Sequence, residues 1–162
     1  MADAFAFLNL EGAVGESQDE KYKDHIELQS VSWGATNSSS FAHGTGPGPG
    51  TRGHIHDMSF TKFMCKASTE LMKRCVKGEP FKKGELILVK QSGDKVGYYT
   101  VKMEEVAVTN YHMSNSGGGH LPHESFSLHF VVVKPNYVQQ DNAGKPKGNF
   151  GFGWDLQKQA EA

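Results

Sequence analysis

His54, His56 and Asp57 are the residues of this chain whose types and spacing come closest to a metal site. On a strand, the two histidines would share one face and lie close enough to contact one ion, whereas Asp57 would point to the opposite face. Histidines elsewhere, such as His129 on the polar phase of a strand, occupy ordinary exposed positions. We therefore expect these residues to be surface side chains, and we expect the chain to hold no metal.

Two cysteines, Cys65 and Cys75, are the other candidates for chemistry, and both fall in a segment with an apolar pattern. Buried, reduced thiols are the expectation for such a pattern, and no local signature supports a Cys-His nucleophile. Residues 48–53 match the spacing G-x-G-x-x-G, but they follow a loop instead of a strand and open no helix. We expect no catalytic residue and no cofactor.

The charge balance and the hydropathy exclude several classes of protein. Lys and Arg number 17 against 18 Asp and Glu, and no segment combines basic and aromatic residues as a nucleic-acid groove would. A net charge of −1 permits self-association without demonstrating it. Apolar runs are too short to cross a bilayer, and the N-terminus carries Asp3 with no basic residue before its apolar stretch. We expect neither membrane insertion nor a signal peptide.

Alternating and apolar runs predict strands in the first part of the chain. Residues 4–10 are almost all apolar, which favours a strand covered on both faces. Residues 25–33 predict a second strand, whose apolar phase changes near Gln29 or Ser30. Such a change indicates a bulge or a switch of the buried face.

Further strands are predicted at residues 86–89, 98–108 and 126–133, with a second bulge at Glu104 and Glu105. Within the last of these, Phe126, Leu128, Phe130 and Val132 fall on one alternating phase. Many strands and one helix predict a mainly β fold for one domain, residues 1–162. Closure of two antiparallel sheets into a barrel would remove the exposed sheet edges.

One helix is predicted at about residues 68–77. Apolar residues recur at helical spacing from 59 to 76, so periodicity alone would predict one long helix. Ser68 is, however, a suitable N-cap, basic residues collect near the end, and Gly78 stands at the C′ position. The shorter helix leaves residues 55–66 open as a strand.

A long exposed loop is predicted at about residues 37–53. Its composition is rich in Ser, Gly and Pro, and it contains Gly46, Pro47, Gly48, Pro49 and Gly50. Loops of this length inside a domain are usually contact surfaces or floppy insertions, and both alternatives remain open.

Four blocks in order resemble the haemolysin-coregulated protein family. Residues 7–17 read FLNLEGAVGES, residues 25–34 read HIELQSVSWG, residues 59–63 read SFTKF, and residues 153–156 read GWDL. Because the blocks span nearly the whole chain, they are more specific than any single motif above. The resemblance also favours a strand at residues 55–66, followed by the short helix.

The resemblance implies a function without catalysis. Proteins of this family form the inner tube of the type VI secretion apparatus, as stacked six-membered rings that a contracting sheath expels. A valine-glycine repeat spike protein sits at the tip, and small effector proteins ride in the lumen. The resemblance therefore implies a chain that assembles in the cytoplasm and is then secreted to the extracellular space or a target cell without a signal peptide.

Three sets of residues are candidates for roles in such a tube. The apolar first strand is the candidate for the contact between subunits, through Phe5, Phe7, Leu8 and Leu10. The small polar face of the second strand is the candidate for the lumen, through Glu27, Gln29, Ser30 and Ser32. The Gly-Pro repeat, residues 46–50, is the candidate for contact between stacked rings, although it is unusual for the family.

An alternative function comes from another class. A monomeric barrel or sandwich would bind a small molecule or a carbohydrate at a mouth formed by Gly-rich loops, with Trp33 or Trp154 as an aromatic platform. A weaker alternative is an enzyme that uses His54, His56 and the cysteines.

Overall fold

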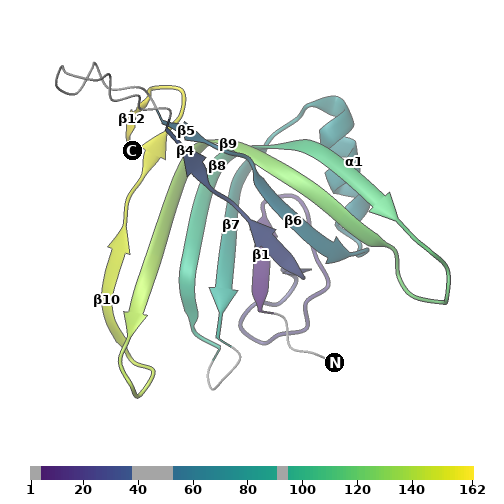
Figure 1. The fold of residues 1–162 in the computed structure, drawn as a ribbon. Coiled ribbons are helices and arrows are strands. Elements are labelled where there is room, and N and C mark those ends of the chain that lie inside the picture. The colour runs from purple at the N-terminus through teal and green to yellow at the C-terminus, as the bar shows by residue number, and fades with distance from the viewer. Residues whose placement is uncertain (1–4, 38–52, 91–94) are drawn as a thin grey trace, which may run out of the picture.

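The computed structural model describes residues 5–37, 53–90 and 95–162, and in these residues it is mainly β. A ten-stranded sheet and a small two-stranded sheet surround the main core, and one helix lies beside them in the described residues (Figure 1). The strands are β1 (Ala6–Leu10), β2 (Ile26–Leu28), β3 (Ser30–Ser32), β4 (Ala35–Thr36), β5 (His54–Ile55), β6 (Met58–Phe63), β7 (Phe81–Val89), β8 (Gly97–Ser114), β9 (His123–Gln140), β10 (Pro146–Gly151), β11 (Trp154–Asp155) and β12 (Ala160–Glu161).

The large sheet curls into a barrel of antiparallel strands. Its main order is β12-β11-β9-β8-β7-β1-β2; in addition, β6 and β10 pair with β9, and β3 pairs with β6. The continuous segment 26–32 pairs with β1 as β2 and then with β6 as β3, so it bridges the two ends of the curled sheet. The predicted change of face at Gln29 is confirmed, because Gln29 lies between these two strands and donates its N–H to the Thr61 carbonyl at 2.8 Å.

Strand β1 is apolar on both faces, as predicted. Ala6, Leu8 and Leu10 point into the main core, while Phe7 packs in a second small cluster and stacks on Tyr22 with ring centroids 4.7 Å apart. Both edges of β1 are occupied, one by β2 and the other by β7.

The burial of β1 argues against its predicted role as the contact between subunits. Phe7, Leu8 and Leu10 are at most 2% exposed, and Phe5 is half-buried against the main core. A neighbouring subunit could reach the first three side chains only if the subunit opened. Exposed surfaces elsewhere are therefore better candidates for that contact.

Strands β8 and β9 are much longer than the sequence predicts and form one long antiparallel pair. The change of buried phase predicted at Glu104 and Glu105 is present, since both are exposed between buried Met103 and Val106 and Glu105 has a φ of 51°. The predicted bulge there is wrong, because the register with β7 and β9 is continuous across these two residues. The shift of register lies further along, between Val108 and Asn110. In β9 the alternation also changes phase, so that Val133 is buried in the core instead of Val132.

Helix α1 (Ser68–Lys77) has the predicted bounds. Gly78 ends it with a φ of 71°, and its N–H donates to the Arg74 carbonyl at 2.9 Å. The N-cap is Ala67 and not Ser68, because the Ser68 hydroxyl is engaged inside the protein. In the described part of the chain, no helix has the length and apolar character that crossing a membrane requires.

Candidate functional site

A face rich in small hydroxyl side chains covers four adjacent strands on the outside of the barrel. We call it the serine-rich face, and its members are Ser30, Ser32, Ser59, Thr61, Asn110, Ser125 and Ser127. They line a shallow depression of about 270 Å³.

The register of the strands aligns these side chains in rows. Ser32 is paired with Ser59, Ser59 with Ser127, and Ser127 with Asn110. The neighbouring row runs from Ser30 through Thr61 and Ser125 to His112 in the same way. Because directly paired residues point to the same face of a sheet, each row crosses β3, β6, β9 and β8.

Local sequence explains why hydroxyls face outward here. In β6, Met58 and Phe60 are buried and alternate with Ser59 and Thr61; in β9, buried Phe126 lies between Ser125 and Ser127. Alternate residues of a strand point to opposite faces, so the aromatic rings fill the core and the small polar residues face out. Phe60 and Phe126 stack at 5.0 Å beneath the rows.

The hydroxyls form hydrogen bonds with one another, and no charged group takes part. The Ser30 and Thr61 hydroxyl oxygens are 2.5 Å apart, and those of Ser59 and Ser127 are 3.0 Å apart. None of the residues that line the depression is acidic or basic. Such a surface offers neutral hydrogen bonds, each of which contributes little net free energy in exchange for water. It therefore suits weak and reversible contacts.

The structure brings together part of the predicted lumen set. Ser30 and Ser32 belong to the serine-rich face, whereas Glu27 and Gln29 are exposed but do not line the depression. The members on the other strands were not predicted from the sequence; they are Ser59, Thr61, Asn110, Ser125 and Ser127. The alternations S-F-T in residues 59–61 and S-F-S in residues 125–127 were the available signal.

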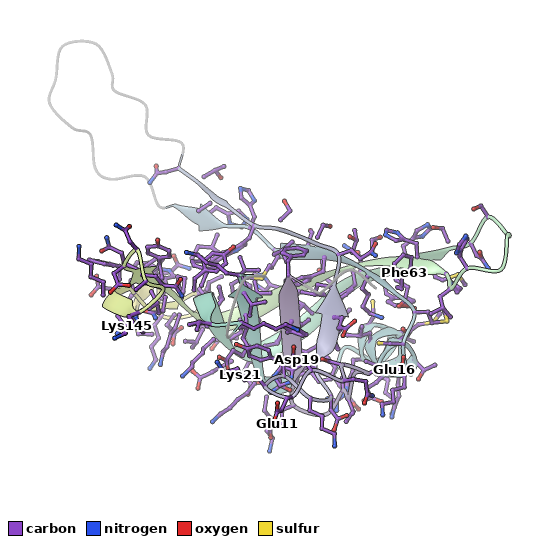
Figure 2. All side chains as sticks on the ribbon, turned by 90° about the horizontal axis from the view of Figure 1, so that it is seen from below. Glu11, Glu16, Asp19, Lys21, Phe63 and Lys145 are labelled. Carbon is purple, nitrogen blue, oxygen red and sulfur yellow. The ribbon has the colours of Figure 1, made fainter. Side chains whose placement is uncertain are left out.

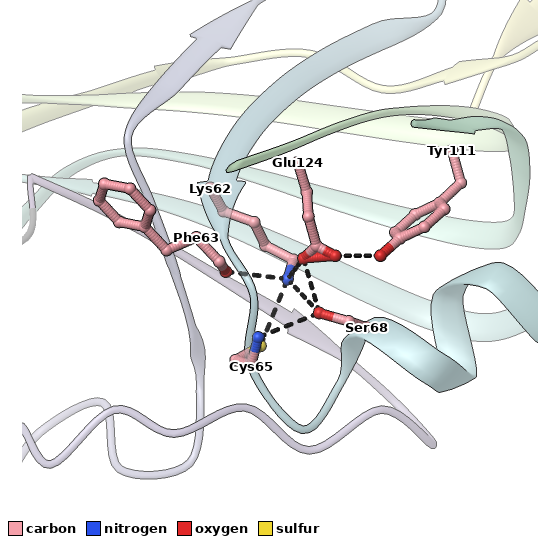
Figure 3. A network of polar contacts seen from close by, with 6 residues as sticks. All are labelled: Lys62, Phe63, Cys65, Ser68, Tyr111 and Glu124. Carbon is pink, nitrogen blue, oxygen red and sulfur yellow. Dashed lines mark hydrogen bonds and ion pairs between the residues drawn. The ribbon is translucent and has the colours of Figure 1, made fainter. Parts of the chain in front are cut away.

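A buried polar network joins β6, β8 and β9, three of the strands that carry the serine-rich face, to α1 (Figure 3). Lys62 of β6 forms an ion pair with Glu124 of β9, and both side chains are fully buried. The Lys62 ammonium also donates to the Ser68 hydroxyl at 2.8 Å, and Ser68 donates to Glu124 at 2.6 Å. The Tyr111 hydroxyl of β8 donates to the other oxygen of Glu124. One carboxylate thereby joins three strands and the helix.

The network has the residue types of a Ser-Lys nucleophile but not its environment. Ser68 is 3% exposed, and Lys62 and Glu124 are inaccessible, so no substrate could reach the hydroxyl. The Lys62 ammonium is engaged by Glu124 as well as by Ser68, so it is not a free base beside the hydroxyl. The arrangement is therefore suited to hold β6, β9 and α1 in place.

The residues first considered for metal binding do not converge. The rings of His54 and His56 lie 5.0 Å apart, but Asp57 bonds elsewhere, to His129 Nδ1 at 2.9 Å and to the Thr109 hydroxyl at 2.9 Å. Among residues 5–37, 53–90 and 95–162, no three His, Cys, Asp or Glu side chains are grouped as a metal ion would need.

The cysteines and tryptophans considered from the sequence do not lie in the surroundings that were expected for them. Cys65 and Cys75 are free thiols and half-buried, not fully buried as expected. Trp33 and Trp154 pack against the core, and Trp33 donates its indole N–H to the His56 carbonyl at 3.0 Å, so neither forms an open platform for a sugar. The candidate stacking residues 46–50 lie outside the described residues.

Solved structures place this fold among proteins of type VI secretion. One, described as the structure of a type six secretion system protein, superposes with a TM-score of 0.91 at 32% identity and covers 97% of this chain and 98% of its own. Hcp1 from Salmonella typhimurium superposes with a TM-score of 0.79 at 26% identity and covers 97% of both chains.

The sequence comparisons specify the family. Residues 7–137 match the family described as "Type VI secretion system effector, Hcp". Protein hcp1 of Pseudomonas aeruginosa is 30% identical over 111 residues, which are 67% of this chain and 68% of that protein. The chain belongs to the Hcp family, and the resemblance stated from the sequence is confirmed.

Proposed function

We propose that this chain is a structural, non-catalytic subunit of the type VI secretion inner tube, which assembles as stacked hexameric rings. The tube assembles in the cytoplasm, and contraction of the sheath exports it, with a valine-glycine repeat spike protein at its tip. Small effector proteins travel in the lumen of the rings. Membership of the Hcp family supports the link to type VI secretion.

The serine-rich face is the observation that carries this proposal. A surface that retains cargo during assembly and releases it after export must bind weakly, and neutral hydroxyls in contact with water do so. Seven small polar residues over four strands form such a surface. In a ring, we assign this face to the lumen, with Ser30 and Ser32 at its first strand.

The test combines the native mass with cargo retention. Light scattering behind size exclusion, at several concentrations, should show a six-subunit species for the purified chain. Ser32→Phe should keep that species and change the amount of small protein that co-purifies per ring, because Ser32 is exposed and contributes only its hydroxyl. Ser32→Ala is the matched control and should change retention less. A strict monomer for the parent chain, or loss of rings in Ser32→Phe, would contradict the proposal.

A further inference from the structure

An exposed row of aromatic side chains extends from the core to the free edge of β10. Tyr99 of β8 packs against the core, Tyr137 of β9 is paired with Tyr99, and Phe150 of β10 is paired with Tyr137. Paired residues share a face, so the row continues the apolar side of the sheet. Tyr137 is 45% exposed and Phe150 60%, which means that the subunit itself does not cover the row.

The outer backbone edge of β10, the last strand of this row, is also unpaired. Among the described residues, β10 pairs only with β9, so its outer edge has no strand beside it. Phe152, just beyond β10, is 57% exposed. We call Tyr137, Phe150 and Phe152 the aromatic edge. Exposed apolar residues at an unpaired edge mark a surface that a partner covers.

The charges beside the aromatic edge restrict the partner. Lys145 lies just before β10 and Lys147 lies in it, and both are exposed. Neither forms an ion pair within the described part of the chain. Pairing of two β10 edges with each other would bring the lysines of both copies to one contact, which like-charge repulsion disfavours. The surface that fits is therefore acidic and carries an exposed apolar residue.

The chain itself has such a surface in residues 11–20, which we call the acidic segment. It contains four acidic residues and no basic one. Glu11, Glu16 and Glu20 are exposed and have no ion-pair partner among the described residues, and Val14 is 53% exposed between the first two. The segment therefore offers carboxylates for the lysines beside the aromatic edge and an apolar side chain for its aromatic rings.

Backbone contacts hold the acidic segment in a defined shape. Gly15 N–H donates to the Asp24 carbonyl at 2.8 Å, and Ser17 N–H donates to the His25 carbonyl at 3.1 Å. A surface already fixed in the free subunit loses little conformational entropy when it is covered.

The two surfaces lie on different sides of the subunit. In Figure 1, β10 is at one side of the barrel, and β1, after which the acidic segment begins, lies nearer the middle, beyond β9, β8 and β7. Figure 2 shows Lys145 at one end of the molecule and Glu16 towards the opposite end. Different, separated patches are what a head-to-tail contact needs, and such a contact closes into a ring when its rotation permits.

We propose that the aromatic edge of one subunit docks on the acidic segment of the next copy, with Lys145 and Lys147 facing Glu11 and Glu16. This inference rests on the proposed ring and names the contact that forms it. Tyr137 and Phe150 cover Val14, and the charges at the rim fix the direction of the contact.

Reversing the charges on each surface, in the purified full chain, tests the contact. The double variants Lys145→Glu/Lys147→Glu and Glu11→Lys/Glu16→Lys should each raise the concentration needed for the six-subunit species by about tenfold or more, because each sets like charges against each other. The combined four-residue variant should recover assembly. Lys73→Glu, at an exposed position on α1 that belongs to neither surface, is the matched control and should assemble as the parent does. Thermal unfolding midpoints show whether each variant is folded.

The outcomes separate this contact from the proposed function. A parent chain that stays monomeric at all concentrations overturns the ring and the contact together. A parent ring that both double variants leave intact overturns the contact alone, as does a combined variant that fails to recover. Zero-length carbodiimide cross-linking gives a second measurement: cross-links from Lys145 or Lys147 to Glu11 or Glu16 of another copy support the contact, and their absence from cross-linked rings contradicts it.

Discussion

Lys62 and Glu124 form an ion pair with both side chains fully buried, between two strands whose outer faces carry the serine rows. Charged groups lose their hydration when they are buried, and only close partners compensate for the loss. Ser68 and Tyr111 supply those partners, because each donates a hydrogen bond to the carboxylate. The serine-rich face and α1 therefore depend on one balanced network.

Removal of the charge of Glu124 should be strongly destabilising. Glu124→Gln leaves the Lys62 ammonium buried without a counter-charge, and losses of about 3–5 kcal/mol are typical when one partner of a buried pair is removed. Urea unfolding followed by circular dichroism measures the change. Glu70→Gln, which removes the half-exposed pair with Arg74 on α1, is the control and should have little effect. An unchanged urea midpoint in Glu124→Gln would contradict the role of the network.

Alkaline pH should weaken the fold through Tyr111. Burial, followed by the hydrogen bond and the charge of Glu124, raises the pKa of the Tyr111 hydroxyl above its ordinary value. Its contribution to the free energy of unfolding is thus complete below pH of about 10, the value of an unfolded tyrosine, and is lost as the pH rises further. Tyr111→Phe should show a shallower loss of stability above that pH. Equal slopes in the parent and in Tyr111→Phe would contradict the assignment.

The strand pattern could be predicted where one face is buried and not where the strand leaves the core. Residues 98–108 show an apolar pattern because Val101, Met103 and Val106 contact the core. Beyond them, β8 continues to Ser114 and β9 to Gln140, with exposed polar residues along much of both extensions. Pairing between the two strands stabilises these parts, and no local hydropathy signal accompanies such pairing.

The site could be predicted only in part because it depends on register between distant strands. Ser30 and Ser32 were found from their own strand, but Ser127 joins them only because β6 lies between β3 and β9. The buried pair of Lys62 and Glu124 could not be predicted for the same reason, because the two residues are 62 positions apart in the sequence. A lysine in an alternating strand is ordinarily read as exposed.

Gly78 should be a sensitive position at the end of α1. Its φ of 71° lies in the left-handed region, where a residue with a Cβ is strained, and Gly78→Ala should cost about 1 kcal/mol. No neighbouring atom lies near the added methyl group, so the loss would report the backbone alone. Gly78→Asn should lose less, because asparagine tolerates this conformation. Equal losses in the two variants by urea unfolding would contradict this explanation.

Gly15 should link stability to assembly, because it holds the acidic segment against the barrel. A Cβ at this position would lie 2.3 Å from the His25 carbonyl oxygen, and backbone on that side cannot move away like the end of a flexible side chain. Gly15→Ala should therefore cost about 1–3 kcal/mol, as overpacking does, and should weaken the six-subunit species by displacing Glu16. Urea unfolding and native mass measure the two effects. Gly34→Ala meets nothing within 4 Å and is the matched control. If Gly15→Ala lost stability but assembled like the parent, the acidic segment would not be part of the contact between subunits.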